Sequence, residues 1–424
     1  MPDLNPSHRM CVVSTRLASA TRLPGKNASI YVLLVSLLIA SAVIPAGFCK
    51  TDPETHRIRV IFLGEVKPIS FPFPGWIESD PKFTLQRVPC DVEWFSEADA
   101  KRFTRLYLPR TYKALVEGYD AAIFEDFTPN ILPPGTLDNF QRAISEEGLG
   151  IVLVEFVFWS QNLNQIDVWK QISFGEVLPA DPTVGSVTNI GRAYYRVLRS
   201  KPILSLPGIE RWPMNAASHG DMYAKEGAVT HAVWKTRGTD AVVSRPYGRG
   251  MALQIAHGWD NIPSSTVVDY DYLPDLIFNE IYFVAQVDPP EDLAVVHSLR
   301  TGFLHIVQRR KAALSLIEFV DRFGARTSIL EEKLIQLNQL AAKAEREYID
   351  SNYEASRETL DRVLSGYDSL DQLAVEVKRR ALMWIYTVEW VTTTATLIIC
   401  LQAVWMLMVK RKAYRAVDST RMKA

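Results

Sequence analysis

The chain has 424 residues, of which 48% are hydrophobic, and its formal net charge is −1. This length allows two or three folded units. The near-zero charge provides no overall field that would attract nucleic acid or a strongly acidic substrate. The four cysteines are too few for a disulfide framework, and only Cys49 and Cys90 are placed to pair outside a membrane.

An apolar run over residues 30–48 follows a segment rich in Lys and Arg. The first part of the run leads into Ala40-Ser41-Ala42, which is typical of a secretory signal peptide with its cleavage site. The whole run is also long enough to be an uncleaved membrane anchor. We therefore expect residues 1–49 to be a cytoplasmic n-region followed by a signal peptide or an N-terminal anchor.

Hydrophobic stretches alternate with amphipathic ones over the next hundred residues. The stretches predict buried strands at residues 57–63, 84–92, 121–127 and 151–158. A proline-rich loop follows the first strand, and helices are predicted from Ser96 toward Glu117 and over residues 137–147. Strands this hydrophobic, alternating with helices, predict a parallel sheet that is covered on both faces.

The pattern changes at Ala228. Three strand-like pieces at residues 228–236, 240–248 and 250–258 are separated by short Gly or Asp turns, which predicts an antiparallel or mixed extension of the sheet. A helix over residues 270–287 then closes the unit, and Pro289-Pro290 marks a boundary. We expect one α/β domain over residues 52–288.

Beyond this boundary, apolar residues recur every three or four positions in three runs. They are Val296, Leu299, Phe303, Ile306, Ala313, Ile317 and Val320; Leu330, Leu334, Leu337, Ala341, Ala344 and Tyr348; and Leu360, Val363, Tyr367, Leu370, Ala374, Val377 and Ala381. Such stripes predict helices packed on helices, here a coiled-coil-like stalk over residues 291–380 with a turn at Phe323-Gly324. The third helix is expected to continue into the next segment, with a possible bend at Gly366.

Residues 390–409 form a run of twenty uncharged residues followed by Lys410-Arg411-Lys412. The run would make about 30 Å of helix, the thickness of a bilayer core. Tyr386, Trp390 and Trp405 are placed as interfacial aromatic residues are. We expect a transmembrane helix over residues 382–409 and a basic tail over residues 410–424.

More basic residues follow this run than precede it, which predicts a cytoplasmic tail and an extracytoplasmic body. The chain would then be a single-pass protein of the cell membrane, or two-pass if the N-terminal segment is not cleaved. The stalk offers a surface for a protein partner, and a coiled coil with that partner is the alternative to a plain spacer.

The sequence lacks the Gly-rich, Walker, Cys-x-x-Cys and His-Glu-x-x-His motifs, so no cofactor and no metal are expected. The α/β half does resemble the class I glutamine-amidotransferase-like superfamily, particularly its ThuA-like branch, over residues 57–287. The resembling pieces are RVIFLGE, YDAAIFEDF, EEGLGIVLVEF, KPILSLPGIERW, YGRGMALQIAHGWDN and LIFNEIYFVAQ. The resemblance implies a flavodoxin-like three-layer sandwich and, in amidotransferases, a Cys-His-Glu triad.

This chain departs from that pattern at the nucleophile. Such enzymes carry the catalytic cysteine in a sharp turn after the fourth strand, where this chain has Val154-Glu155-Phe156. Neither Cys49 nor Cys90 lies in such a turn, so thioester chemistry is not expected. Cys90 is expected to be a small buried residue of a strand. His257 resembles the late histidine of the family.

Acidic residues and His257 follow several predicted strands. In open α/β sheets ligands bind beyond the carboxyl ends of the strands, so these side chains are expected to meet there. The catalytic candidates are Glu155, His257 and Glu125, and the ligand-binding candidates are Glu65, Asp126 and Asp260. The competing interpretation is that these residues cap helices or pair with Arg.

Two functions follow from these observations. The first is a membrane-anchored extracytoplasmic binding or scaffold protein with an inactive amidotransferase-like domain, part of a cell-surface or transport assembly. The alternative is a surface hydrolase or isomerase that acts on a small polar, sugar-like substrate through the acidic and histidine side chains.

Overall fold

The computed structural model describes residues 51–52, 54–64, 73–90, 95–125, 129–154, 172–182, 192–215, 220–259, 270–322 and 327–421, and side chains as far as residue 415. The predicted signal or anchor segment lies outside these residues. So do Cys49, Glu65, Asp126, Glu155 and Asp260.

A mixed sheet forms the centre of the α/β domain. Five neighbouring strands are parallel, in the order β2 (Phe83–Pro89), β1 (Ile58–Gly64), β3 (Ala121–Glu125), β4 (Gly150–Val154) and β11 (Gly250–Ile255). Beyond β11 the sheet continues through antiparallel β10 (Asp240–Tyr247), β9 (Val229–Trp234), β6 (Ala193–Val197) and β7 (Pro213–Asn215). Short β8 (Met222–Ala224) pairs with β10, and β5 (Ala180–Pro182) pairs with β8. The prediction of a parallel sheet with an antiparallel extension is confirmed.

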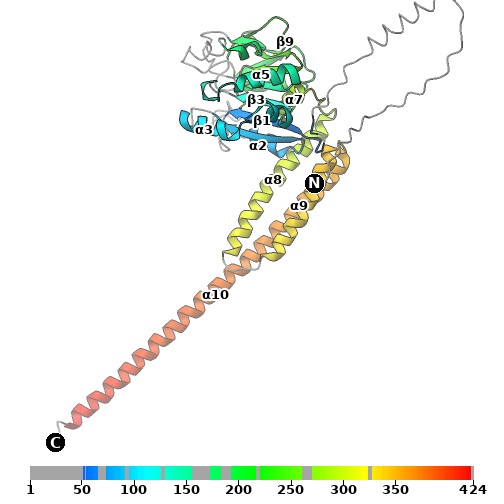
Figure 1. Ribbon diagram of the computed structural model, residues 1–424. Coiled ribbons are helices and arrows are strands. Elements are labelled where there is room, and N and C mark those ends of the chain that lie inside the picture. The colour runs from blue at the N-terminus through cyan, green and yellow to red at the C-terminus, as the bar shows by residue number, and fades with distance from the viewer. Residues whose placement is uncertain are drawn as a thin grey trace, which may run out of the picture. The chain divides into compact units, whose positions relative to one another are not determined.

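Helices cover both faces of the parallel strands (Figure 1). One face is covered by α2 (Phe73–Ser79) and α7 (Leu273–Val284), and the other by α3 (Glu97–Tyr107), α4 (Tyr112–Gly118) and α5 (Thr136–Glu147). The side chains of β3 and β4 are buried on both faces, which explains why these strands are hydrophobic without interruption.

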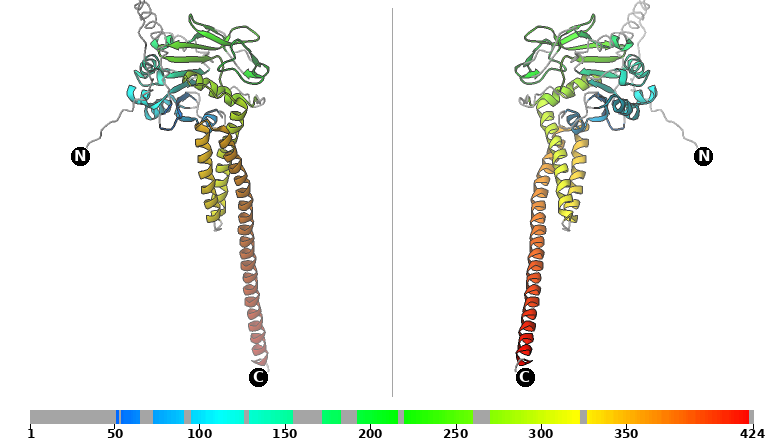
Figure 2. Two further views of the ribbon diagram at one scale, coloured as in Figure 1. Left: turned by 90° about the vertical axis from the view of Figure 1, so that its right-hand side faces the viewer. Right: turned by 90° about the vertical axis from the view of Figure 1, so that its left-hand side faces the viewer.

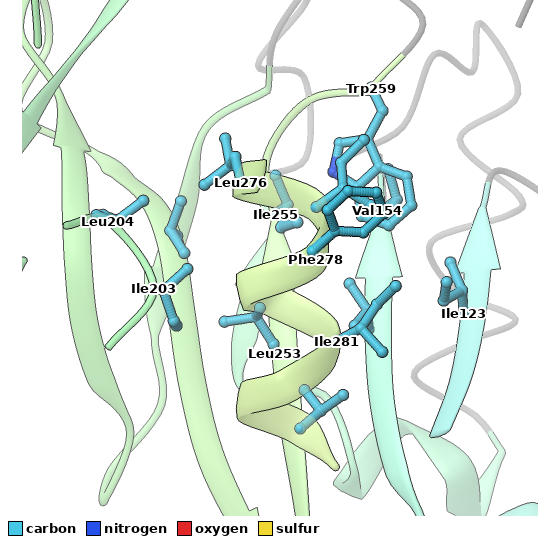
Figure 3. Close-up of a cluster of buried hydrophobic side chains, with 14 of the residues drawn as sticks. Ile123, Val154, Ile203, Leu204, Leu253, Ile255, Trp259, Leu276, Phe278 and Ile281 are labelled. Carbon is cyan, nitrogen blue, oxygen red and sulfur yellow. The ribbon is translucent and has the colours of Figure 1, made fainter. Parts of the chain in front are cut away.

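Helix α7 lies directly on the sheet. Figure 3 shows Leu276, Phe278 and Ile281 of this helix against strand residues that include Leu253 and Ile255. The approach is close at Gly150, because a Cβ atom there would lie 2.2 Å from the Val284 carbonyl oxygen. Glycine at this position therefore lets the helix end rest on the backbone of β4.

The helix predicted from Ser96 toward Glu117 is two helices. Ser96 caps α3 as expected, since its hydroxyl accepts the Asp99 amide at 3.2 Å. The chain leaves the helix at Leu108, because the residue before a proline is disfavoured in helical conformation. Thr111 then caps α4 by accepting the Ala114 amide at 3.1 Å.

Three helices follow the α/β domain: α8 (Leu293–Asp321), α9 (Ser328–Ile349) and α10 (Tyr353–Arg421). The predicted apolar stripes form their shared core, so helix-on-helix packing is confirmed. Gly366 does not end α10, which runs through it as one helix. A Cβ atom at Gly366 would lie 2.3 Å from Leu337 Cδ2, so this glycine makes room for a neighbouring helix.

A buried ionic cluster connects these helices to the α/β domain. Arg300 of α8 donates from Nε to Asp80 Oδ2 at 2.8 Å and from Nη1 to Asp275 Oδ1 at 2.5 Å. Tyr348 of α9 donates to Asp80 at 3.1 Å, and His297 Nδ1 lies 2.6 Å from Asp275 Oδ2. We call these five residues the Arg300 joint. It crosses the boundary predicted at Pro289-Pro290, so the two parts share buried charges.

Among the described residues, α10 alone is long and apolar enough to cross a membrane, judged by length and composition. The apolar part of this helix is fully exposed, and Figure 2 shows it without a neighbouring helix in the described structure. An exposed helix of this kind is compatible with membrane anchoring.

Candidate functional site

The parallel strands place their carboxyl ends at one edge of the sheet, where the sequence predicts a site. Of the candidates, Glu125 at the end of β3 and His257 just after β11 are described. Glu65, Asp126, Glu155 and Asp260 lie outside the described residues.

Glu125 is buried and leans toward β1. A Cβ atom built on Gly64 would lie 2.8 Å from the Glu125 Cβ and 2.9 Å from Oε2, so the side chain crosses over that glycine. Strand β1 lies on one side of β3, whereas β4 and β11 lie on the other. The carboxylate of Glu125 is therefore directed away from His257, and the structure does not bring these two candidates together.

His257 is buried and both of its ring nitrogens have partners. Nδ1 lies 2.7 Å from the Gly258 carbonyl oxygen, which only accepts, so Nδ1 carries the proton. Nε2 hydrogen-bonds the Tyr195 hydroxyl of β6. Burial raises the pKa of Tyr195 well above its usual value, which keeps this group a hydroxyl. The imidazole ring lies against the rings of Tyr195 and Trp234.

A buried carboxyl group that the sequence analysis missed lies close to this pair. Glu280 of α7 accepts the Trp259 indole N–H at 3.0 Å through Oε2, and its Oε1 has no hydrogen-bond partner among the described residues. Burial raises the pKa of Glu280 well above its usual value, so the group is a neutral acid. The sequence carries a signal for it, because α7 is mostly apolar, with Asp275, Asn279 and Glu280 as its acidic and amide residues, and a helix this apolar is buried.

Aromatic rings line the sheet edge beside Glu280. Trp259 lies near Val154 at the end of β4 (Figure 3), and its ring centre is 5.3 Å from that of Phe73 in α2. We call Tyr195, Trp234, His257, Trp259 and Glu280 the sheet-edge cluster. Its groups are hydrogen-bond donors and acceptors in an apolar setting, suited to orienting a polar ligand by hydrogen bonds. No group of His, Cys, Asp and Glu in the described part of the chain is arranged to hold a metal ion.

Cys90 lies on the other face of the sheet. It is fully buried, as predicted, in the core beneath α3, α4 and α5. The residues around His257, including Tyr195 and Trp259, belong to the core beneath α2 and α7. The sheet therefore separates this thiol from the imidazole, and the two cannot form a nucleophile–base pair in this arrangement.

A separate open cleft of about 670 Å³ lies at the loop after β6, lined by Val197, Ser200, residues 204–211 and Leu293. The loop is held by the Tyr270 hydroxyl, which donates to the Pro207 carbonyl at 3.0 Å, and by Asn279, which donates to the Ile203 carbonyl at 3.2 Å. Neither of the two described candidates, Glu125 and His257, lines this cleft.

No family model and no curated protein matches the chain. Among solved structures, it is similar to a cytoplasmic protein of Salmonella typhimurium LT2, with 16% identity, a TM-score of 0.42 and coverage of 54% of this chain and 99% of that one. A second cytoplasmic protein of Salmonella typhimurium has 13% identity, a TM-score of 0.43 and the same coverage. A catalytic mutant of a GH42 beta-galactosidase from G. stearothermophilus has 12% identity and a TM-score of 0.30, covering 56% of this chain and 31% of that one. Similarities this weak do not establish a shared fold.

Proposed function

We propose that this chain is a membrane-anchored, extracytoplasmic binding or scaffold protein with a catalytically inactive, glutamine-amidotransferase-like domain. The strand order supports the flavodoxin-like assignment. With β11 counted as the fifth strand, the order β2-β1-β3-β4-β11 is the 2-1-3-4-5 order of flavodoxin-like sheets. Helices on both faces complete three layers.

The observation that carries the proposal is the separation of Cys90 from His257. Thiol catalysis of amide hydrolysis needs a thiolate with a base within hydrogen-bond reach. Here the thiol is buried on one face of the sheet, and the imidazole on the other face already uses both nitrogens. The sheet-edge cluster instead offers hydrogen-bonding groups without a thiol, which favours binding over acyl transfer.

The alternative, a hydrolase or isomerase acting on a sugar-like substrate, expects Glu155, Glu125 and His257 to meet around one pocket, and Glu155 lies outside the described residues. The Glu125 side chain crosses Gly64 toward β1, on the side of β3 away from β11. This orientation favours the binding function over the catalytic one.

The helical unit supports a scaffold role. Leu314, Ile335 and Val375 are large apolar side chains that are more than half exposed on α8, α9 and α10. Helices of this kind can bind a protein partner through apolar side chains on their outer faces. We propose that the helical unit binds a protein of a cell-surface or transport assembly, with Ile335 among the contact residues.

An ammonia-release assay tests the absence of thiol chemistry. The purified full chain in detergent is incubated with glutamine beside Cys90→Ser and a matched variant, Cys400→Ser, whose cysteine lies exposed in the apolar part of α10. We expect none of the three proteins to release ammonia above a no-protein control. Release by the wild type and by Cys400→Ser, abolished in Cys90→Ser, would contradict the proposal.

A second experiment tests the scaffold role. The tagged chain is recovered from its native membrane in mild detergent, and a discrete co-purifying protein is expected. Ile335→Glu should lose that protein, while Leu106→Glu, at a similarly exposed position on α3, should retain it. Equal recovery by both variants would place the partner elsewhere.

A further inference from the structure

The three-helix unit ends where the aromatic part of α10 begins. Side chains of α10 are buried as far as Ala381, whereas Met383 and Trp384 are exposed. The last turn of α8 lies beside α10 at this level, because Lys378 Nζ is 5.2 Å from the centre of the Phe319 ring. Met383 follows Lys378 by only about 8 Å along the helix. The last turn of α8 therefore lies about one to two helical turns before the part of α10 where the exposed aromatic residues begin.

This end of the helical unit combines apolar and charged side chains. Phe319 is 40% exposed and Ile329 is 60% exposed. The exposed acidic side chains on α8 and α9 here are Glu318, Asp321, Glu331 and Glu332, whereas α10 presents three consecutive exposed basic residues, Lys378, Arg379 and Arg380. We call Phe319, Arg322, Ile329, Lys378, Arg379 and Arg380 the membrane-end surface.

The basic groups of this surface are available to anions. Lys378 and Arg379 form no ion pair with a described residue. Arg322 and Arg380 pair with Glu318 and Glu376 at 2.5 Å, one helical turn away on the same helix. Exposed pairs of this kind are weak, so the guanidinium groups can exchange these partners for others.

We propose that the membrane-end surface binds the phosphate groups of anionic phospholipids in the leaflet that α10 enters. The inference rests on the membrane anchoring in the proposed function, and it adds a second contact between the protein and the bilayer. Lys and Arg side chains reach phosphates while their stems lie along apolar surface, and aromatic residues favour the headgroup level. Anionic lipid attracts basic residues beside a span, and Lys378, Arg379 and Arg380 stand side by side just before the apolar part of α10.

The contact would hold the α8–α9 pair against the membrane. Because α8 and α9 carry Arg300 and Tyr348 of the Arg300 joint, the position of the α/β domain above the bilayer would then depend on lipid charge.

Site-specific fluorescence quenching tests this inference on the full chain. Cys11, Cys49 and Cys400 are replaced by Ser, fully buried Cys90 is left, and one cysteine is placed at residue 329, 335 or 106 for labelling with an environment-sensitive dye. The protein is inserted into vesicles of phosphatidylcholine, or of equal parts phosphatidylcholine and phosphatidylglycerol, that carry a headgroup spin label. Quenching of Trp405 by lipids brominated in the acyl chain, taken as the difference in tryptophan quenching between this protein and its Trp405→Phe variant, reports insertion of α10 separately.

We expect the dye at Ile329→Cys to be quenched at least twofold more than the dye at Leu106→Cys, and more strongly with phosphatidylglycerol. Ile335→Cys lies about 9 Å farther along α9 from its first residue than Ile329→Cys does, so its dye should be quenched to an intermediate extent. Lys378→Gln with Arg379→Gln should remove the dependence on phosphatidylglycerol. Equal quenching at residues 329 and 106, with Trp405 quenched, would overturn this inference and leave the anchoring intact. Absence of Trp405 quenching would overturn the anchoring and this inference with it.

Discussion

Replacing Arg300 by Met removes the positive charge from the Arg300 joint. Asp80 and Asp275 would then be two like charges buried side by side without their shared cation, because both carboxylates are almost fully buried. Breaking a buried ion pair by removing one partner costs about 3–5 kcal/mol. Asp80 keeps the Lys82 amide and Tyr348, and Asp275 keeps His297, so we expect the lower end of that range, about 3 kcal/mol.

Urea unfolding followed by circular dichroism measures this cost on a chain of residues 51–381, which lacks the apolar segment. Arg309→Met is the matched control, since Arg309 lies on the same helix and makes exposed pairs with Asp368 and Asp371. That control should lose less than about 1 kcal/mol. Adding Asp80→Asn to Arg300→Met should restore part of the loss, because it removes one unpaired charge. If Arg300→Met costs no more than Arg309→Met, the joint does not hold the two parts together.

Three further changes test other parts of the structure by the same unfolding measurement. Burial lowers the pKa of His231 from 6.5 to about 4, so the unfolded chain binds a proton first and stability falls as the pH drops from about 6.5 to 4. His231→Gln should abolish about 2–3 kcal/mol of that loss at pH 4, and an unchanged pH profile would refute the assignment. Burial raises the pKa of Glu280, so the stability of the folded protein falls as the pH rises above the pKa that Glu280 has in the unfolded chain. The stability of Glu280→Gln relative to the wild type should therefore be higher at pH 8 than at pH 4. A lower relative stability at pH 8 would argue against a neutral acid at this position. Gly366→Ala should destabilise by about 1–2 kcal/mol, because Leu337 must move, whereas a flexible bend at Gly366 would instead be stabilised by Ala.

Periodicity was sufficient to predict the five parallel strands, β9, β10 and the helical unit, but it did not predict β5, β6, β7 or β8. The strand around Val152 is hydrophobic without a break because both of its faces are covered, and the stripe that contains Leu337 marks the seam between helices. Two local errors had local causes. Pro109 divides the helix after Ser96, and α2 forms within the stretch predicted to be a proline-rich loop because a proline such as Pro74 is tolerated in the first turn of a helix.

The polar clusters were out of reach of periodicity. Arg300 lies between core residues of α8, at a position that a heptad pattern assigns to solvent. It is buried because α8 packs against the α/β domain there, where Arg300 pairs with Asp80 and Asp275. His257 was found at the predicted edge, but its partner Tyr195 comes from a strand more than sixty residues earlier. Such pairings depend on sheet topology, which the local pattern does not encode.

The most direct test of the account is protease treatment of intact cells that express the chain with a C-terminal tag. The proposed topology places the α/β domain and the three-helix unit outside and the tail after residue 410 inside. Protease should therefore remove the α/β domain and leave a protected fragment that carries the tag and α10. Loss of the tag while the α/β domain survives, with the membrane still sealed, would reverse the topology and contradict the account.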